Sequence, residues 1–578
     1  MPDTKRDNRT EPNKGEVKYT DIWLKYRKSH DYMQLKRIVS KTDRNWQFYI
    51  GNQWVGMKTG GEDLPSMNII KPIVKYKVST VSQQNLTANY SDASADNQTT
   101  YESLYRELNR KFDLAWDKAK MTDFAWKNNK AAAIQGESYA YFWSTEINDT
   151  PQLISNTSIM FGDENIEDIQ EQPYILIRER LELKDVVERA KANGIDESEY
   201  SAIATDSETE DVVYNKDEVS DKVTSLLYMT KINGVVNVAR TTKTCVYEPL
   251  RPLAGTRNGV AVGGLTTYPI IPFKWEPKPN SMRGVGEVEC LLPNQIELNK
   301  TLARRAMAVK LAAFPRLAYD TTAIDNPADL DKVGKAIGVT TGNAQSISQA
   351  IAYLNASNIS SDADALFNDL INQTKDLAGA GDNALGNVDP ERASGQAIIA
   401  VRDQTQVPLN EQINGFKRWV EDVAMLWFDM LITYHPDEFE VDVHTEVTDP
   451  VTGVSNDVTE RRKLSVEEVL KVRPTVRIDI SEDNKWTKLA EQQSADNLLK
   501  EQAITFEEWV EICGENGPVP KGKLQKIVQE RQAKARIHAQ IQQQQMEQQA
   551  AMAQQQAQQG QQPQQQQMPQ PMQQANNG

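Results

Sequence analysis

The chain has 578 residues, of which 39% are hydrophobic, and a formal net charge of −16. This length predicts several domains with cores of their own. The acidic excess argues against a protein that wraps tightly around DNA, because such binding needs clustered lysine and arginine side chains that displace counterions from the phosphates.

The N-terminal region is expected to be rich in helices. Residues 1–18 are polar and mixed in charge, which is typical of a flexible arm. The aromatic-rich segment 46–54 is expected to end in a turn. Apolar residues at helical spacing predict three helical stretches, namely Ile22 to Val39, 68–84, and 101–133 with Leu114 on its apolar stripe.

Strands are expected to predominate in the next part of the chain. Aromatic and β-branched residues predict them at 138–144, 174–178, 225–232, 235–241, 244–248 and 268–275. Asn233 and Gly234 separate two of these strands, and they favour a type I′ hairpin turn because both tolerate positive φ angles. A helix over Leu183–Ala192 is expected to end with Gly194 as its C′ residue.

A helix, a small β unit and a second helix are expected after Pro293. The first helix, 294–312, is ended by Pro315, and a strand-like RLAYD sequence follows it. Residues 321–360 contain short strands and turns, including KAIGVTT and AIAYLN. The second helix runs from Asp362 to Leu377.

The glycine-rich segment 378–395 is predicted to be a mobile loop. A helical pattern then runs from Gln396 to Tyr434, and Pro408 must kink it or mark a break. Strands at 438–447 and 473–483 precede helices at 484–512 and 521–546. The glutamine-rich tail has too few apolar residues to fold alone. The predicted class is therefore α+β, mostly α.

Neither a catalytic nor a metal site is predicted, and no cofactor is expected. The histidines His30, His435, His444 and His538 lack metal-ligand spacing, and no GxSxG motif occurs. Gly51 to Thr59 nearly matches a phosphate-binding loop, but Met57 separates the second glycine from the lysine. Gly284-Val-Gly286 lacks the third glycine of a dinucleotide site.

Compartment signals are also missing. No apolar stretch follows a basic one at the N-terminus, and no apolar run approaches the roughly 20 residues that cross a bilayer. Cys245, Cys290 and Cys513 form no CxxC pair, which favours buried thiols in a reducing compartment. The protein is expected in the host cytoplasm or in a particle assembled there.

The helix after Pro293 is basic. It carries Lys300, Arg304, Arg305 and Lys310. These residues form either a solvated face, a ring of positive charge, or ion pairs with acidic residues of a neighbouring subunit. Suitable partners would be Asp362, Asp364, Asp369 and Asp376.

Four segments in this order resemble the portal proteins of tailed bacteriophages. They are YIGNQW (49–54) with MNIIKPIV (67–74), the stretch 268–305 with its strand, glycine turn and Gln- and Asn-bearing helix, the helix–loop–helix 362–435 with ASGQAIIAV (393–401), and the glutamine-rich C-terminus. The resemblance covers about residues 45–540.

The resemblance implies a portal fold with wing, stem, clip and crown regions in a closed ring. The implied regions are an arm (1–18), the wing (19–292), stem helix 1 (293–312), the clip (313–361), stem helix 2 (362–377), a tunnel loop (378–395), a long kinked helix with wing strands (396–499), crown helices (500–545) and a disordered tail (546–578).

The implied function is mechanical. A ring of about twelve copies would form the channel at one capsid vertex for DNA packaging, retention and ejection, passing double-stranded DNA without reading its sequence. Implied partners are the major capsid protein, the terminase large subunit and a head–tail adaptor protein, with no membrane partner. Alternatives are another virion structural or scaffolding protein, or a packaging-machine enzyme.

In addition to the basic face of the stem, the resemblance assigns two groups of site residues. Channel-facing residues of the tunnel loop would be Gly379, Gly381, Asp382, Asn383, Asn387, Asp389, Glu391 and Arg392. The clip would dock its partners through Asp320, Asp325, Asp329, Asp331, Lys332 and Lys335.

Overall fold

The structure is a computed structural model in which the chain divides into two compact units, Met1–Ser481 and Glu482–Gly578. In the second unit it describes the helical residues 498–500 and Trp509. In the first unit it describes residues 17–57, 64–83, 85–91, 102–206, 221–257, 260–313, 316–322, 324, 326–330, 336, 338–340, 351–354, 361–381, 407–435, 440–448, 455–463 and 475–481.

Helices and strands are both abundant, in agreement with the α+β prediction. The helices are α1 (Tyr19–Leu35), α2 (Ile38–Ile50), α3 (Ile70–Ser82), α4 (Glu102–Lys118), α5 (Met121–Gln135), α6 (Leu183–Ala192), α7 (Glu197–Tyr200), α8 (Glu287–Ala313), α10 (Ser361–Leu377) and α12 (Asn410–Tyr434), with 3₁₀ turns η2 (Ile169–Glu171), η4 (Pro327–Asp329) and η5 (Val407–Leu409).

The largest described sheet is antiparallel and has the order β4-β5-β6-β7-β8. Its strands are β4 (Ile159–Phe161), β5 (Ile175–Glu182), β6 (Lys222–Ile232), β7 (Val235–Thr241) and β8 (Val246–Pro252). A second sheet joins β11 (Ile270–Lys274), β2 (Glu137–Tyr141) and β3 (Gln152–Ile154). Two-stranded pairs are β9 (Gly255–Arg257) with β10 (Val260–Val262), β12 (Glu276–Pro277) with β13 (Gly284–Val285), β14 (Arg316–Tyr319) with β15 (Ile351–Leu354), β16 (Glu440–Thr448) with β17 (Ser455–Lys463), and β1 (Asn85–Ser91) with β18 (Thr475–Ser481).

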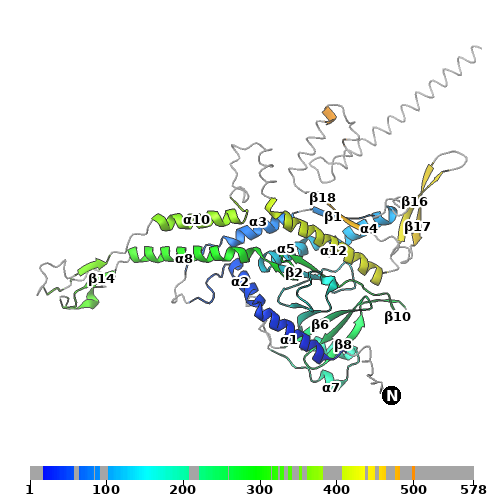
Figure 1. Ribbon diagram of the computed structural model, residues 1–578, viewed down its shortest axis with the longest axis horizontal. Helices are drawn as coiled ribbons and strands as arrows, with labels where there is room; N and C mark the ends of the chain where they lie inside the picture. Colours follow the sequence, from blue (N-terminus) through cyan, green and yellow to red (C-terminus); the bar gives the residue numbers. More distant parts are fainter. Residues whose placement is uncertain are drawn as a thin grey trace, which may run out of the picture. The chain divides into compact units, whose positions relative to one another are not determined.

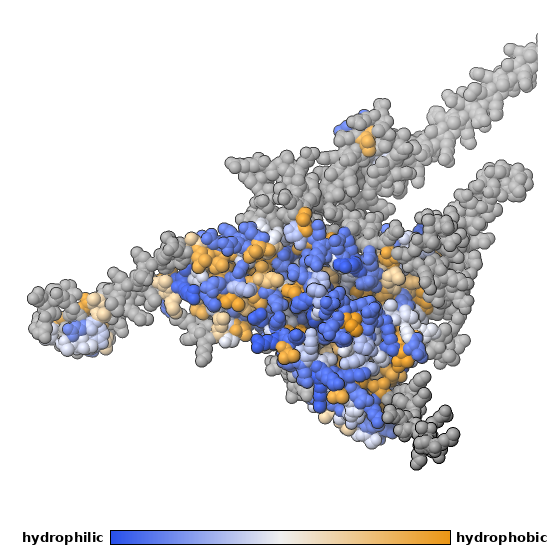
Figure 2. Space-filling view, in the orientation of Figure 1, coloured by the Kyte–Doolittle hydropathy of each residue, from blue (hydrophilic) through white to orange (hydrophobic). Residues whose placement is uncertain are grey.

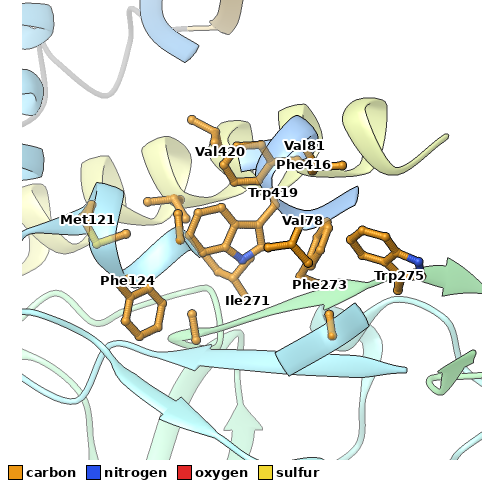
Figure 3. Close-up of a cluster of buried hydrophobic side chains, with 14 of the residues drawn as sticks. Val78, Val81, Met121, Phe124, Ile271, Phe273, Trp275, Phe416, Trp419 and Val420 are labelled. Carbon is orange, nitrogen blue, oxygen red and sulfur yellow. The ribbon is translucent and has the colours of Figure 1, made fainter. Parts of the chain in front are cut away.

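The main core lies between the helices α3, α5 and α12 and the sheet strand β11 (Figure 3). Trp419 of α12 lies at the centre of this core and is 1% exposed. Its ring stacks on Phe416 at 5.8 Å and on Phe124 at 6.5 Å between centroids. Large aromatic side chains contribute much of the burial that stabilises a core, so α12 is fixed on the sheet by its aromatic face.

A long-range strand pair joins β1 to β18, the last strand of the first unit. β1 pairs antiparallel with β18, with Ala88 opposite Ile478. The buried Tyr90 of β1 donates its hydroxyl hydrogen bond to the Ala424 carbonyl of α12 at 2.7 Å. Burial raises the pKa of the Tyr90 phenol well above its usual value, so it stays a donor.

Several locally encoded features are confirmed. The helix α6 has the predicted bounds, and Gly194 after it has a φ of +73°. The β6–β7 hairpin turns through Asn233 and Gly234, whose φ angles are 53° and 81°. Both are short-range signals in which the residue type determines the backbone conformation.

Other predictions were wrong. The stretch 101–133 forms two helices, α4 and α5, because Lys120 between them has a left-handed φ of 51°. Leu114 is 51% exposed and not part of the buried stripe. The strands β1 and β17 were not predicted, since their polar sequences give no strand signal.

Two helix starts also differ from the prediction. α8 begins at Glu287, with Pro293 inside it, because the buried Val288, Leu291 and Leu292 keep the preceding turn packed as helix. Pro408 marks a break: it lies in η5, and α12 begins at Asn410. Residues 396–406, which were predicted as helix, lie outside the described residues.

Candidate functional site

The helices α8 and α10 lie side by side and extend from the body of the first unit (Figure 1). Beyond α8 the chain forms the antiparallel pair of β14 and β15, with Arg316 opposite Leu354. At about 1.5 Å per residue, α8 is on the order of 40 Å long. The structure therefore contains the predicted order of helix, small β unit and helix.

This helix pair leaves large apolar side chains uncovered. Met307 and Val309 of α8 are 51% and 57% exposed, and Leu366 and Leu377 of α10 are 50% and 78% exposed. Figure 2 shows hydrophobic residues among hydrophilic ones along these helices. Exposed apolar side chains that gather on one element are typical of a protein contact, so these two helices are the first candidates for an assembly surface.

Side-chain amides attach α8 to the body. Gln295 accepts a hydrogen bond from the Ile69 backbone N–H at 3.0 Å and donates to the Met67 carbonyl at 2.7 Å and to Asn299 Oδ1 at 3.0 Å. Asn299 donates in turn to Gln53 Oε1 at 2.5 Å. All three side chains are buried, and buried amides stabilise a fold only when they are paired. These paired amides therefore hold α8 in a fixed position on the body of the first unit.

A second amide joins the two helices. Asn294 of α8 donates to Thr374 Oγ1 of α10 at 3.1 Å, and Thr374 donates to the Leu370 carbonyl at 2.6 Å. Thr374 is fully buried. The pair is therefore fastened at its base, where it joins the body.

A buried arginine lies just before α8. Arg283 donates from Nε and Nη2 to both carboxylate oxygens of Glu164 at 2.9 and 2.8 Å. Its Nη1 lies 3.5 Å from Glu137 Oε1, and the arginine also donates to the carbonyls of Asn156 at 2.9 Å and Ile159 at 3.2 Å. Burial acts to lower the pKa of Arg283, but Tyr139, Glu164 and Glu137 together raise it above its ordinary value, so the arginine remains charged. Burial raises the pKa of Glu137, and the charge of Arg283 opposes that rise.

Glycines allow the backbone to pass close to this network. A Cβ at Gly284 would lie 2.6 Å from the Gly136 carbonyl oxygen, and one at Gly286 would lie 2.9 Å from the Gly136 nitrogen. The N–H of Gly284 donates to Glu137 Oε2 at 2.9 Å. The Gly284-Val-Gly286 sequence is therefore a site of close backbone packing at the root of α8.

The first turn of α8 is held by another buried ion pair. Lys77 of α3 lies 2.7 Å from Glu287 Oε1, and the Trp275 indole donates to Glu287 Oε2 at 3.3 Å. A carboxylate at a helix N-terminus is favourable because it faces the positive end of the helix dipole. The charged residues Arg283, Lys77 and Glu287 were not singled out from the sequence, because their partners lie far away along the chain or carry no motif.

The basic residues predicted on the stem helix make contacts within the chain. Arg305 lies 2.8 Å from Asp364 of α10, and its guanidinium sits 5.0 Å from the Phe367 ring centroid. Lys300 and Arg304 both lie 3.5 Å from Glu297. Lys310 is exposed.

The predicted tunnel loop begins at a helix cap. Gly379 follows α10 with a φ of +61°, and a Cβ there would lie 3.3 Å from Pro408 of η5. Ala378 and Ala380 are buried, and Gly381 is partly buried. The end of α10 and the start of α12 are therefore adjacent. Asp382, Asn383, Asn387, Asp389, Glu391 and Arg392 lie outside the described residues.

The predicted clip surface is described in part. Asp320 is exposed and accepts hydrogen bonds from the Thr322 N–H at 2.9 Å and its hydroxyl at 2.6 Å, which lower the pKa of the carboxyl. Asp329 ends η4. Asp325, Asp331, Lys332 and Lys335 lie outside the described residues.

The described part of the chain offers neither a metal site nor a membrane-spanning helix. There, no group of three histidine, cysteine or acidic side chains is placed to hold a metal ion. Nor is any helix in the described ranges long and apolar enough to span a bilayer. In the segment that nearly matches a phosphate-binding loop, Gly51 has a φ of 107° and caps α2. Residues 58–63, which follow, lie outside the described residues.

Comparison with known protein families identifies the family of the chain. The model of the family described as Phage P22-like portal protein matches residues 167–577. This is more than half of the chain, and it includes Arg283, the pair α8 and α10, and α12. A comparison with curated proteins found no match. The resemblance to phage portal proteins is thereby confirmed, and the chain belongs to the family of Phage P22-like portal proteins, which are structural proteins.

Proposed function

We propose that copies of this chain form a closed ring at one vertex of a phage capsid, and that double-stranded DNA passes through the channel of the ring. The observation that supports the ring most directly is the exposed apolar surface of α8 and α10, including Met307 and Leu366 at 51% and 50% exposure. Repetition of one interface around an axis covers such surfaces without leaving free ends.

The ring is tested by the mass of the purified assembly. Native mass spectrometry and negative-stain images of the full chain should give a ring of about twelve copies. Met307→Glu with Leu366→Glu should shift the population to monomers, because burying two uncompensated charges costs several kcal/mol. The matched control is Leu35→Glu on α1, which is 79% exposed and should leave rings intact. A wild-type chain that stays monomeric under all conditions contradicts the proposal.

In this ring, α8 and α10 act as the stem and the unit of β14 and β15 as the clip, where the terminase large subunit and a head–tail adaptor dock in turn. Asp320, Asp325, Asp329, Asp331, Lys332 and Lys335 are the proposed docking residues. The major capsid protein surrounds the ring. The energy for DNA movement comes from a separate ATPase, so nucleotide hydrolysis by the purified chain would favour a packaging enzyme instead.

The segment after Gly379 is the proposed constriction of the channel. The adjacency of Gly379 and Pro408 supports this role, because the loop leaves the stem and returns to the wing at nearly the same point. Replacement of residues 379–386 by a short linker should leave rings intact and reduce packaged or retained DNA. Unchanged DNA content in particles with that replacement contradicts the role.

A further inference from the structure

Three lysines gather on one face of the helices α3 and α5. Lys71 and Lys75 are one turn apart on α3, so they share a face of that helix. Lys130 belongs to α5, which packs directly against α3. The charges of Lys75 and Lys71 lower the pKa of the Lys130 ammonium, in addition to the effect of its partial burial. One helical turn separates Lys71 from Lys75, and the packing of α3 against α5 brings Lys130 to the same pair of helices.

This lysine patch, Lys71, Lys75 and Lys130, has no anionic partner in the described part of the chain. No carboxylate there forms an ion pair with any of the three, although other cations on the same elements do pair: Lys77 of α3 lies 2.7 Å from Glu287. The net charge of the chain is −16, so carboxylates are abundant. Like charges held together without compensation are unfavourable, and an external polyanion would relieve the repulsion.

Aromatic rings hold the third lysine in place. The Lys130 ammonium lies 5.4 Å from the Tyr49 ring centroid and 5.8 Å from that of Trp126. Trp126 is 39% exposed. A cation within about 6 Å of a ring face is attracted by the ring quadrupole. Lys130 is thereby positioned at the surface and does not swing freely in solvent.

The residue type distinguishes between two kinds of polyanion. Protein interfaces favour arginine, whose planar fork pairs with carboxylates, and they are depleted in lysine. A lysine ammonium is a compact point charge that contacts phosphate oxygens without geometric demand. A patch made only of lysines, beside an exposed indole, thus fits a nucleic-acid backbone better than the acidic surface of another copy.

We propose that Lys71, Lys75 and Lys130 form a binding site for the phosphate backbone of duplex DNA, used without sequence readout. This inference rests on the proposed function, because it assumes that DNA passes through the ring. The lysine patch itself is separate from the stem helices and from the loop after α10. It also lies before residue 167, where the family match begins, so it belongs to a part of the chain for which that match assigns nothing.

The test measures DNA binding by intact rings. The variant Lys71→Gln/Lys75→Gln/Lys130→Met removes three charges and shortens each side chain by one heavy atom. Binding of a fluorescein-labelled duplex of arbitrary sequence is followed by anisotropy over a salt series. Each lost phosphate contact lowers the slope of log K against log salt by about 0.9, so one engaged patch predicts a slope smaller by about 3. At about 50 mM salt the affinity should fall at least tenfold.

The control removes the same number of charges elsewhere. Lys28→Gln/Lys118→Gln/Lys184→Gln alters exposed lysines dispersed over α1, α4 and α6, and it should change neither affinity nor slope by more than twofold. The milder Lys71→Gln/Lys75→Gln variant leaves the half-buried Lys130 in place, so it should retain the fold and lower the slope by about 2.

Ring mass is measured on every variant. If wild-type rings form but the patch variants bind DNA with the affinity and slope of the control, or if wild-type rings bind no duplex, the inference is wrong while the proposed function stands. If the patch variants alone lose the ring, the patch is an interface between copies, and the inference is also wrong. If the wild type forms no ring, the proposed function itself fails.

Discussion

The buried ion pairs next to the N-terminus of α8 allow the sharpest test of how this fold is stabilised. Arg283→Met removes the only charged donor that contacts Glu164 and Glu137 among the described residues, while methionine retains much of the apolar stem. The arginine side chain is 7% exposed, and those of Glu164 and Glu137 are 8% and 3% exposed. The variant therefore leaves two carboxylates buried without their partner.

The expected loss is large because of this burial. Removing one partner of a buried ion pair costs about 3–5 kcal/mol. An unfolding entropy of about 2.1 cal/mol/K per residue gives about 1 kcal/mol/K for a unit that spans Met1–Ser481. The first unit should therefore melt about 3–5 °C lower. Arg189→Met is the matched control, because that side chain is 44% exposed and 3.7 Å from Glu248. It should cost less than about 1 kcal/mol.

The deficit should depend on pH in a defined direction. Burial already raises the pKa of Glu137 above its ordinary value of 4.5, and Arg283 opposes the rise. In the variant the folded-state pKa rises further. A raised folded-state pKa gives stability that is present below the unfolded value and is lost as pH increases through the folded value. The variant should thus be nearest to wild type at about pH 4.5 and furthest from it at pH 7–8.

Thermal and urea unfolding of wild type and both variants at pH 5, 6, 7 and 8 check this expectation. Adding Glu164→Gln and Glu137→Gln to Arg283→Met should recover part of the loss at pH 7, since neutral amides do not carry the cost of a buried charge. A deficit below 1 kcal/mol, or one that is equal at pH 5 and pH 8, would refute the reasoning.

Two further predictions concern the same region. Gly284→Ala should lower the free energy of unfolding by about 1–3 kcal/mol, because its Cβ would lie 2.6 Å from the Gly136 carbonyl. Gly415→Ala should raise the free energy of unfolding, because alanine favours a helix and its Cβ would meet only Phe273, at 3.6 Å. Calorimetry measures both changes. Gln295→Leu should cost about 1–3 kcal/mol by leaving the buried Ile69 backbone N–H and the buried Asn299 side chain without their partner. Glu297→Gln, whose side chain is 43% exposed on α8, should change stability by less than about 1 kcal/mol. Equal effects within either pair would contradict the assigned contacts.

The comparison of sequence and structure separates local from long-range information. The β6–β7 turn and the end of α6 depend on single residues, Asn233, Gly234 and Gly194, whose permitted φ angles are properties of the residue itself. The break at Pro408 is of the same kind, although the sequence alone left a kink open. Such features are predicted correctly because no distant partner is needed.

The sequence predicted the two helices of the candidate site, but it did not predict the contacts that hold them in place. Helical periodicity and the resemblance placed the helix pair α8 and α10. For the basic residues the sequence left open a solvated face, a ring of charge or ion pairs between subunits, whereas Arg305 pairs with Asp364 within the chain. The start of α8 was misplaced because Val288, Leu291 and Leu292 are held by a core that no local pattern reveals.

By itself, the sequence determined the order of helix, small β unit and helix after Pro293, the turn at Asn233 and Gly234, the cap at Gly194, and the membership of the portal family, since each depends on residue types and their spacing along the chain. Tertiary structure alone decided the buried network of Arg283, Glu164 and Glu137, the β1–β18 pairing, and the lysine patch on α3 and α5. The reason is physical: an ion pair, a strand register or a shared charged face depends on distances between residues far apart in the chain, and folding brings those residues together.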